Sequence, residues 1–204
     1  MKVWLIIAGL LAASSAQAET TGFDKDRAGA APAGWKAGVT GGGAPRWEVT
    51  ADSAAKSKPN VLKQAGQGDF PWCVKEDVSL ADGFVEVSFK PLSGEDDQAG
   101  GVVWRFKDGD SYYVARGNAL ENNVSLYYVE KGKRKTLKYV DAPVEKNGWN
   151  TLRVEFNGRR IRVALNGKAY IEMDDEHIGG AGAVGVWTKA DSVTAFDDFK
   201  YGKK

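Results

Sequence analysis

GGVVWRFKDGDSYYVARGNALENNVSLYY, residues 100–128, is the stretch that decides the fold. It contains three runs in which apolar and polar side chains alternate, at 101–107, at 111–117 and from 123 onward to 130. Successive side chains of a strand point to opposite faces, and Asp-Gly is a preferred hairpin turn. The stretch therefore predicts three consecutive antiparallel strands.

The faces of these strands follow from the turn between the first two. A two-residue turn at Asp108-Gly109 would pair Arg105 with Tyr112 and Trp104 with Tyr113. A four-residue loop would keep the same faces, whereas a three-residue loop would exchange one strand's set. The predicted core side chains are Trp104, Phe106, Tyr113 and Ala115. The predicted outward side chains are Val103, Arg105, Tyr112, Val114 and Arg116, with Tyr127 from the third strand.

Further strand patterns occur at 84–90, 149–156, 159–165, 183–188 and 193–201, and no segment has a sustained helical period. About a dozen short antiparallel strands can bury their apolar sides only by stacking two sheets or closing a barrel. We therefore predict an all-β fold, a two-sheet antiparallel β-sandwich of the jelly-roll type. Within residues 19–75 we expect strands joined by longer loops, with GVTGGGAP (38–45) as a mobile loop.

The first eighteen residues have the pattern of a secretory signal peptide. Lys2 precedes an apolar run from Val3 to Ala13, and Ala16-Gln17-Ala18 is a small-x-small cleavage site. The apolar run is too short to be expected to span a membrane. We predict cleavage after Ala18, a periplasmic or secreted protein, and a single domain over residues 19–204.

Charge and cysteine content restrict the partners and the means of stabilisation. The chain has 28 basic and 27 acidic residues, and removing the leader takes away only Lys2. The resulting balance argues against nucleic acid or a membrane surface as the partner of the mature chain. Cys73 is the single cysteine, so an intramolecular disulfide is excluded, and we expect this thiol to be buried and inert.

The predicted outward face of the three strands carries arginines and phenols. A sugar offers equatorial hydroxyls around an apolar face of C–H bonds, which suits planar multi-donor groups beside an aromatic ring. Trp187 also points outward in the strand pattern of 183–188. The alternative is a solvated face whose arginines are braced by carboxylates. The predicted ligand-binding residues are Arg105, Tyr112, Arg116, Tyr127 and Trp187, and the predicted partner is carbohydrate.

Four segments together carry a resemblance to a known family: GGVVWRFKDGDSYYVAR, NNVSLYYVEKGKRKTL, WNTLRVEFNGRRIRVALNG and GAVGVWTKADSVTAFDDF. They resemble the 3-keto-disaccharide hydrolase domain family. This resemblance implies a concanavalin A-like jelly roll, shared with laminarinase-type and laminin G-like domains, and carbohydrate work outside the cytoplasm. It leaves three hypotheses: a lectin-like binding protein, which we favour, a glycoside hydrolase of the family's type, and a laminin G-like protein-interaction domain.

Catalysis by hydrolysis usually needs two carboxyl groups that flank the glycosidic bond. In the laminarinase-type relatives these lie on one strand as E-x-D-x-E, which Glu172, Asp174 and Glu176 match in spacing. The segment nevertheless has the pattern of a strand end that enters a loop. Glu121, beside the predicted binding face, is a further candidate. The sequence assigns no catalytic residue among these four.

A structural calcium ion is the one cofactor that the resemblance implies. Jelly-roll relatives hold such an ion at positions similar to Asp24, near the mature N-terminus, and to Asp197 and Asp198, near the C-terminus. Calcium prefers carboxylate and backbone oxygens. Adjacent carboxylates on an outer strand are more often simply solvated.

Overall fold

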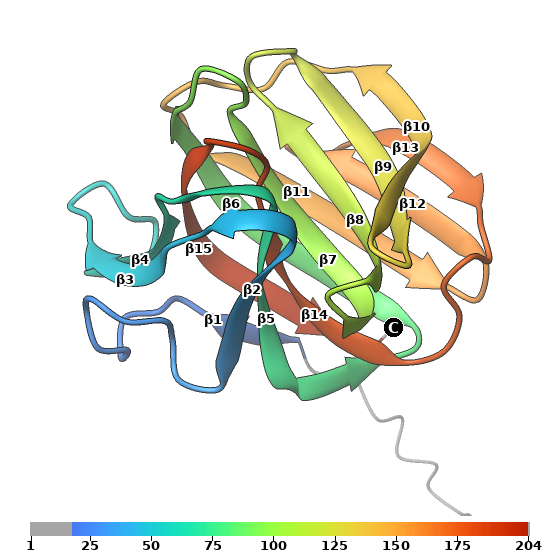
Figure 1. Ribbon diagram of the computed structural model, residues 1–204, viewed down its shortest axis with the longest axis horizontal. Helices are drawn as coiled ribbons and strands as arrows, with labels where there is room; N and C mark the ends of the chain where they lie inside the picture. The colour runs from blue at the N-terminus through green and yellow to red at the C-terminus, as the bar shows by residue number, and fades with distance from the viewer. Residues whose placement is uncertain (1–17, 204) are drawn as a thin grey trace, which may run out of the picture.

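The computed structural model describes residues 18–203 and shows a sandwich of two antiparallel sheets (Figure 1). These residues form fifteen strands, and none of them lies in a helix. No membrane-crossing helix therefore exists in this part of the chain. The predicted signal peptide, residues 1–18, lies outside the described residues except for Ala18. The predicted all-β jelly roll is confirmed.

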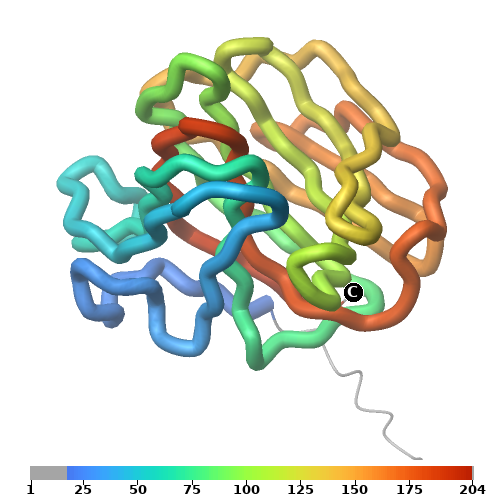
Figure 2. The backbone as a smooth tube through the Cα atoms, viewed as in Figure 1, coloured from blue at the N-terminus to red at the C-terminus, as the bar shows by residue number. Residues whose placement is uncertain are grey.

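The two sheets have eight and seven strands. In the eight-stranded sheet the order is β13 (Lys168–Asp174), β12 (Arg160–Leu165), β11 (Asn150–Asn157), β6 (Gly83–Ser93), β15 (Val193–Gly202), β4 (Asn60–Gln64) and β3 (Trp47–Ala51), and β1 (Glu19–Thr21) pairs with β15. In the seven-stranded sheet the order is β10 (Lys133–Asp141), β9 (Asn123–Glu130), β8 (Ser111–Asn118), β7 (Ala99–Asp108), β14 (Gly182–Trp187), β5 (Gln67–Leu80) and β2 (Trp35–Ala44). The tube in Figure 2 shows the first and last strands running together, as the pairing of β1 with β15 requires.

The hydrophobic core fills the space between the two sheets. Trp104 from the seven-stranded sheet stacks on Tyr113 of the neighbouring strand, with ring centroids 5.2 Å apart. It also stacks on Phe156 of the opposite sheet at 6.0 Å. Ala115 belongs to the same buried cluster. The predicted core positions of Trp104, Tyr113 and Ala115 are therefore confirmed, as alternation along the strands requires.

A β-bulge changes the predicted positions of Phe106, expected in the core, and Arg105, expected on the outer face. The pairing of β7 with β8 is regular from Ala99 to Trp104 and then shifts, and Arg105 has a left-handed φ of 47°. Residues 105–107 of β7 therefore lie opposite the single residue Tyr112 of β8, and the bulge breaks the alternation of side chains over these three residues. Phe106 consequently leaves the core and stacks on Tyr112 on the outer face, with ring centroids 5.2 Å apart. The hairpin turn lies at 109–110, one residue later than predicted.

The predicted mobile loop at residues 38–45 is instead mostly strand, because β2 continues to Ala44. The prediction was wrong since three successive glycines carry no alternating side chains to mark a strand. Gly43, with φ of 122°, packs directly against Gly68 of β5, where a Cβ atom would collide with the backbone. This close approach brings β2 and β5 together along one side of the seven-stranded sheet.

Two connections between the sheets meet at one end of the sandwich. Residues 94–98 lead from β6 to β7, and residues 188–192 lead from β14 to β15. The Asp191 carboxylate accepts hydrogen bonds from the backbone nitrogens of Glu95 (2.6 Å) and Asp97 (3.0 Å), and also from that of Asp96. One carboxylate therefore fixes the first connection against the second, and both connections contribute to the site described next.

Candidate functional site

The outer face of the seven-stranded sheet carries a second hydrophobic cluster, separate from the core. Its buried members are Trp72, Val74, Val103, Phe106, Tyr112, Val114, Tyr127, Val129 and Trp187. Glycines make room for the large rings: a Cβ atom at Gly38 would collide with Trp72. Phe70, half-buried on β5, covers Trp187 in a nearly parallel stack, with centroids 5.9 Å apart. Together with Phe70, this cluster forms a closely packed apolar surface on the outer face, called the aromatic floor below.

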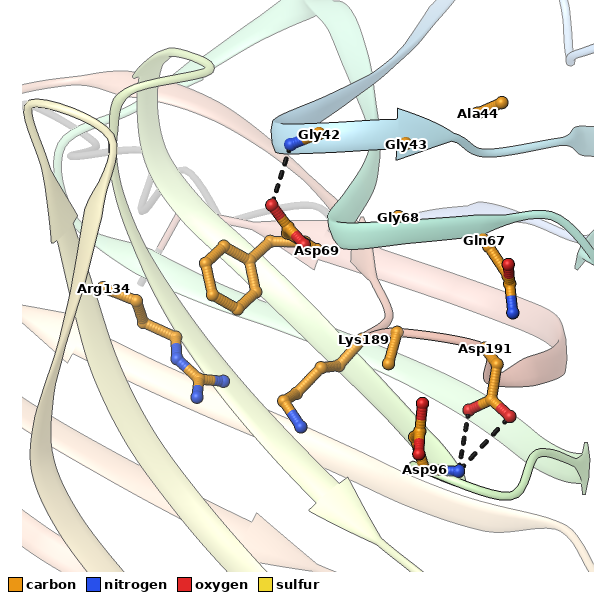
Figure 3. Close-up of a pocket in the computed structure, with 12 residues that line it drawn as sticks. Gly42, Gly43, Ala44, Gln67, Gly68, Asp69, Asp96, Arg134, Lys189 and Asp191 are labelled. Carbon is orange, nitrogen blue, oxygen red and sulfur yellow. Dashed lines mark hydrogen bonds between the residues drawn. The ribbon is translucent and has the colours of Figure 1, made fainter.

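A pocket of about 740 Å³ opens beside this floor (Figure 3). Its lining comprises residues 42–44, 67–70 and 189–191, together with Asp96 and Arg134. Figure 3 shows Arg134 and Lys189 extending into the pocket from separate elements, while Asp96 and Asp191 lie together at its far end. The cationic groups thus lie near the aromatic floor and Asp96 and Asp191 lie at the opposite end, with the carboxylate of Asp69 between them.

Arg134 reaches the pocket from the edge strand β10. Its guanidinium carbon lies 4.3 Å from the ring centroid of Tyr127, 4.7 Å from that of Phe70 and 6.0 Å from that of Trp187. Cations favour the negative faces of aromatic rings. Burial lowers the pKa of Arg134, a shift that the nearby Tyr127 opposes. Within residues 18–203 its guanidinium makes no hydrogen bond and has no carboxylate within 4.0 Å.

A buried polar network adjoins the pocket. Asp97 is fully buried and accepts hydrogen bonds from Nδ2 of Asn118 at 2.7 Å, from Nη1 of Arg116 at 3.4 Å and from the ammonium group of Lys189. Nη2 of Arg116 donates to Glu121 at 2.7 Å. Glu121 in turn accepts Nδ2 of Asn123 at 2.7 Å, which also contacts the Tyr139 hydroxyl. The network holds Lys189, which lines the pocket, and links it through Asp97 and Arg116 to Glu121.

The two carboxyl groups of this network experience different environments. Burial raises the pKa of Asp97, although the charges of Arg116 and Lys189 oppose that rise. Burial alone would also raise the pKa of Glu121. Hydrogen bonds from Asn123 and Arg116, and the charge of Arg116, outweigh it and leave that pKa lowered. Glu121, whose side chain is 42% exposed, is therefore firmly ionised at neutral pH.

Four of the five predicted ligand-binding residues lie together on this outer face, namely Tyr112, Arg116, Tyr127 and Trp187. All four are buried, so they support the surface formed by Phe70, Arg134 and Lys189. Their contact with a ligand remains a prediction.

The predicted position of Arg105 on this face was wrong, because the β-bulge turns its side chain to the other side of the sheet. Its guanidinium is buried and donates to three backbone oxygens: those of Ala81 (3.0 Å), Ile178 (3.1 Å) and Gly158 (2.7 Å). Asp82 accepts a fourth hydrogen bond at 3.4 Å. These bonds join three connections at one end of the sandwich.

Three of the predicted catalytic candidates do not line the pocket. Glu172 and Asp174 are on β13, the edge strand of the eight-stranded sheet, and Glu176 follows it. Each is exposed and ion-paired: Glu172 with Arg160 (2.9 Å) and Arg162 (3.2 Å), Asp174 with Arg160, and Glu176 with Arg159. The strand indeed ends at Asp174. Only Glu121 of the four candidates belongs to the pocket side of the molecule.

The predicted calcium residues are engaged in hydrogen bonds. Asp197 is buried and accepts the backbone nitrogen (2.8 Å) and hydroxyl (2.7 Å) of Ser57, as well as the backbone nitrogen of Asp198. Asp24 accepts the backbone nitrogen of Asn60 at 3.0 Å. No group of three or more Asp, Glu, His or Cys side chains suited to a metal ion occurs among residues 18–203. A structural calcium ion at these residues stays a prediction.

Sequence reasoning missed Phe70, Asp96, Lys189 and Arg134 as parts of a site. For Arg134 a signal was present: Lys131-Gly132 follows a clear strand, and both residues have the positive φ angles of a tight hairpin turn, 52° and 71°. The strand after that turn would have placed Arg134 opposite Val129, beside the outward face.

Solved structures share this fold. The carbohydrate-binding module CBM66 from Bacillus subtilis superimposes with a TM-score of 0.67 at 20% identity, covering 82% of this chain and 94% of the module. Bacillus licheniformis beta-glucanase gives 0.58 at 12%, covering 95% and 100%. Domain 4 of AbnA, a GH43 extracellular arabinanase from Geobacillus stearothermophilus, solved with arabinotriose, gives 0.58 at 13%, covering 84% and 82%. At these identities the likeness concerns the fold alone.

Sequence comparison reaches further. No curated protein matches the chain significantly. The model of the 3-keto-alpha-glucoside-1,2-lyase-like domain, however, matches residues 21–200, which include nearly every strand of both sheets and the whole lining of the pocket. It is the family that the four quoted segments resemble, and the chain belongs to this 3-keto-alpha-glucoside-1,2-lyase-like family.

Proposed function

We propose that this chain is an exported carbohydrate-binding protein and that the pocket on the outer face of the seven-stranded sheet is its sugar site. One observation carries the proposal: the half-buried ring of Phe70 and the ionic groups of Arg134, Lys189 and Asp96 converge on one pocket of about 740 Å³. That volume suits a small oligosaccharide. Export is supported by the signal-peptide pattern of residues 1–18.

The chemistry of the pocket matches the two sides of a pyranose ring. Phe70 offers a flat apolar surface, held in place by its stack on Trp187, on which C–H groups can lie. Arg134 and Lys189 donate hydrogen bonds, and Asp96 accepts them, so hydroxyl groups can be bound both as acceptors and as donors. CBM66 is named as a carbohydrate-binding module, and the arabinanase domain was solved with arabinotriose, which adds weight on the same fold.

The direct test is calorimetric titration with a panel of plant and microbial oligosaccharides, comparing the wild type with Phe70→Ala. Loss of the ring should weaken binding about 10-fold or more, because the stacking surface is removed. Phe84→Ala is the matched control: Phe84 is also half-buried beside an arginine, but on the outer face of the eight-stranded sheet. Equal affinity of both variants and the wild type would contradict the assignment of the site.

A second candidate function is cleavage of an oxidised disaccharide, favoured by the family's description as 3-keto-alpha-glucoside-1,2-lyase-like. The proton on C2 beside a 3-keto group is acidic. A base removes it, the C1–O bond breaks as a C1–C2 double bond forms, and the leaving oxygen takes up a proton. In this pocket Asp96 would be the base, and Arg134 and Lys189 would stabilise the negative charge on the keto oxygen.

Product analysis after incubation with plain and 3-keto disaccharides separates these functions. Cleavage by elimination would release one intact sugar and one unsaturated keto sugar, and Asp96→Asn should abolish both products. Hydrolysis would yield two saturated sugars. Persistence of every substrate, with saturable binding, would leave the binding function alone.

A further inference from the structure

The guanidinium of Arg134 has no ion-pair partner within the described residues. Of the three cationic side chains near the pocket, Arg116 is paired with Asp97 and Glu121, and Lys189 is paired with Asp97. Arg134 has aromatic rings as its neighbours and no carboxylate within 4.0 Å in residues 18–203. It nevertheless lines the pocket. Asp97 acts on this charge only from beyond ion-pair distance, and a cation held in a fixed position without a paired carboxylate is suited to an anionic ligand.

The rings also fix how the guanidinium is presented. Tyr127 and Phe70 lie within 4.7 Å of its central carbon, and its Nη1 atom is buried. Nε and Nη2 are therefore the donors left to meet a bound molecule. Two parallel N–H donors on one planar group match the two oxygens of a carboxylate or sulfate group, and an immobilised fork loses little entropy on binding.

The strand that supplies Arg134 is itself rich in cationic side chains. Lys131 precedes β10, and Lys133, Lys135 and Lys138 lie on it, all exposed and without an ion-pair partner in residues 18–203. Lysines on an edge strand also discourage pairing with other chains. Lys133 and Lys135 flank Arg134 on the strand, so their side chains point to the opposite face and contribute only to the wider positive field around β10.

The opposite end of the pocket bears acceptors. Asp96 lines it without an ion-pair partner in the described residues, and Asp69, which accepts the backbone nitrogen of Gly42 at 2.8 Å, lies between the two ends. Carboxylates suit the hydroxyl groups of a sugar but repel a second anionic group. The pocket therefore distinguishes the two ends of a ligand.

We infer that the pocket takes an acidic sugar: its carboxylate or sulfate group binds the fork of Arg134, and its hydroxyl groups donate to Asp96 and Asp69. This inference rests on the proposed function, since it specifies the class of carbohydrate bound at the same site. The shared chemistry is an anion on a sugar ring, and the two sources of that anion are separated by experiment.

The experiment is calorimetric titration of the full mature chain with three oligosaccharides of equal length: an oligogalacturonate, a sulfated galactan and a neutral galactan. The acidic ligands should bind at least about 10-fold more tightly than the neutral one, and Arg134→Gln should remove about 10- to 100-fold of that affinity. Raising the salt concentration from about 50 to about 500 mM should weaken only the acidic ligands.

Two further variants serve as controls for this interpretation. Arg134→Lys keeps the charge but loses the fork, so it should bind acidic sugars with intermediate affinity. Arg153→Gln removes an arginine from the other outer face and should change nothing in binding. Unchanged thermal unfolding of each variant confirms that it is folded.

The outcomes are distinct. Preference for the oligogalacturonate or for the sulfated galactan supports the inference and identifies the anion. Neutral and acidic ligands of equal affinity, or equal losses for both in Arg134→Gln, overturn the inference while the proposed function stands. Absence of binding to every oligosaccharide, including those of the wider panel, overturns both.

Discussion

Both outer faces of the sandwich pack an arginine against an aromatic ring, but with different partners. On the eight-stranded sheet, Arg153 lies 4.0 Å from the centroid of Phe84 and pairs with Glu86 at 3.2 Å and Glu155 at 3.1 Å. On the seven-stranded sheet, Arg134 lies over Tyr127 without any carboxylate within 4.0 Å in residues 18–203.

The difference lies in the counter-charge rather than in the residue types. In the first arrangement two carboxylates neutralise the arginine, so it needs no partner from outside its own sheet. The second leaves a charge and two donors facing a pocket. An arginine beside an aromatic ring is thus a weak indicator of a ligand site, and the missing carboxylate is the informative feature.

The ionic groups on the seven-stranded sheet are also more deeply buried than those on the eight-stranded sheet. The largest expected effect tests this difference in burial. Asp97→Asn removes the only fully buried charge of the polar network, leaving Arg116 and Lys189 without their shared partner. We expect a loss of about 3 to 5 kcal/mol in the free energy of unfolding, measured by urea denaturation.

The control is Glu172→Gln on the eight-stranded sheet, whose side chain is 47% exposed although it pairs with two arginines. Solvent-exposed pairs contribute about 0 to 1 kcal/mol. Similar losses for the two variants would show that the buried network is no more important to stability than the surface pairs.

Arg105 sharpens the comparison because it belongs to neither face. Arg105→Met removes the donors for three backbone oxygens while keeping much of the side-chain volume. We expect unfolding to become easier by about 1 to 3 kcal/mol, since buried acceptors are left unsatisfied. Ligand affinity should stay unchanged.

The matched variant is Arg159→Met, an exposed arginine paired with Glu176 in the same region, which should unfold like the wild type. Weakened sugar binding in Arg105→Met, with the stability unaltered, would return Arg105 to the ligand site.

The fold could be predicted from the sequence wherever side chains alternate. The strands around Trp104, Tyr113 and Leu126 are marked by apolar residues at every second position, and such a pattern has one physical interpretation. Residues 41–43 have no side chains to alternate, and β10 is mostly charged and has a register shift between Thr136 and Lys138. These strands form because they pair with neighbouring strands, and a local sequence pattern contains no information about that pairing.

The site was harder to predict because its geometry depends on two non-local features. The bulge at Arg105 is a backbone event that exchanges faces over three residues, and no residue type demands it. The pocket joins two inter-sheet connections to β2, β5 and β10, so its residues come from five separate parts of the chain. Strand alternation correctly grouped Tyr112, Arg116, Tyr127 and Trp187, yet it could not indicate that they lie beneath the surface.

The smallest expected effect concerns one acidic segment that contains both kinds of carboxylate. Glu172, Asp174 and Glu176 are exposed, whereas Asp175 between them is turned inward and accepts the hydroxyl of Tyr113 and the ring Nδ1 of His177 at 2.8 Å. Burial alone would raise the pKa of Asp175, but these hydrogen bonds and the backbone nitrogen of His177 outweigh it, so that its pKa is lowered.

A lowered folded-state pKa means that ionised Asp175 stabilises the folded protein at pH values above its unfolded pKa of about 3.9. The stabilisation is lost as the pH falls through the folded-state value. Relative to Asp175→Asn, the wild type should be more stable by about 1 kcal/mol at pH 7, and the gap should close from about pH 5 downward. Urea denaturation across this range measures it. A gap that stays constant with pH would mean that the inward carboxylate acts through its shape rather than its charge.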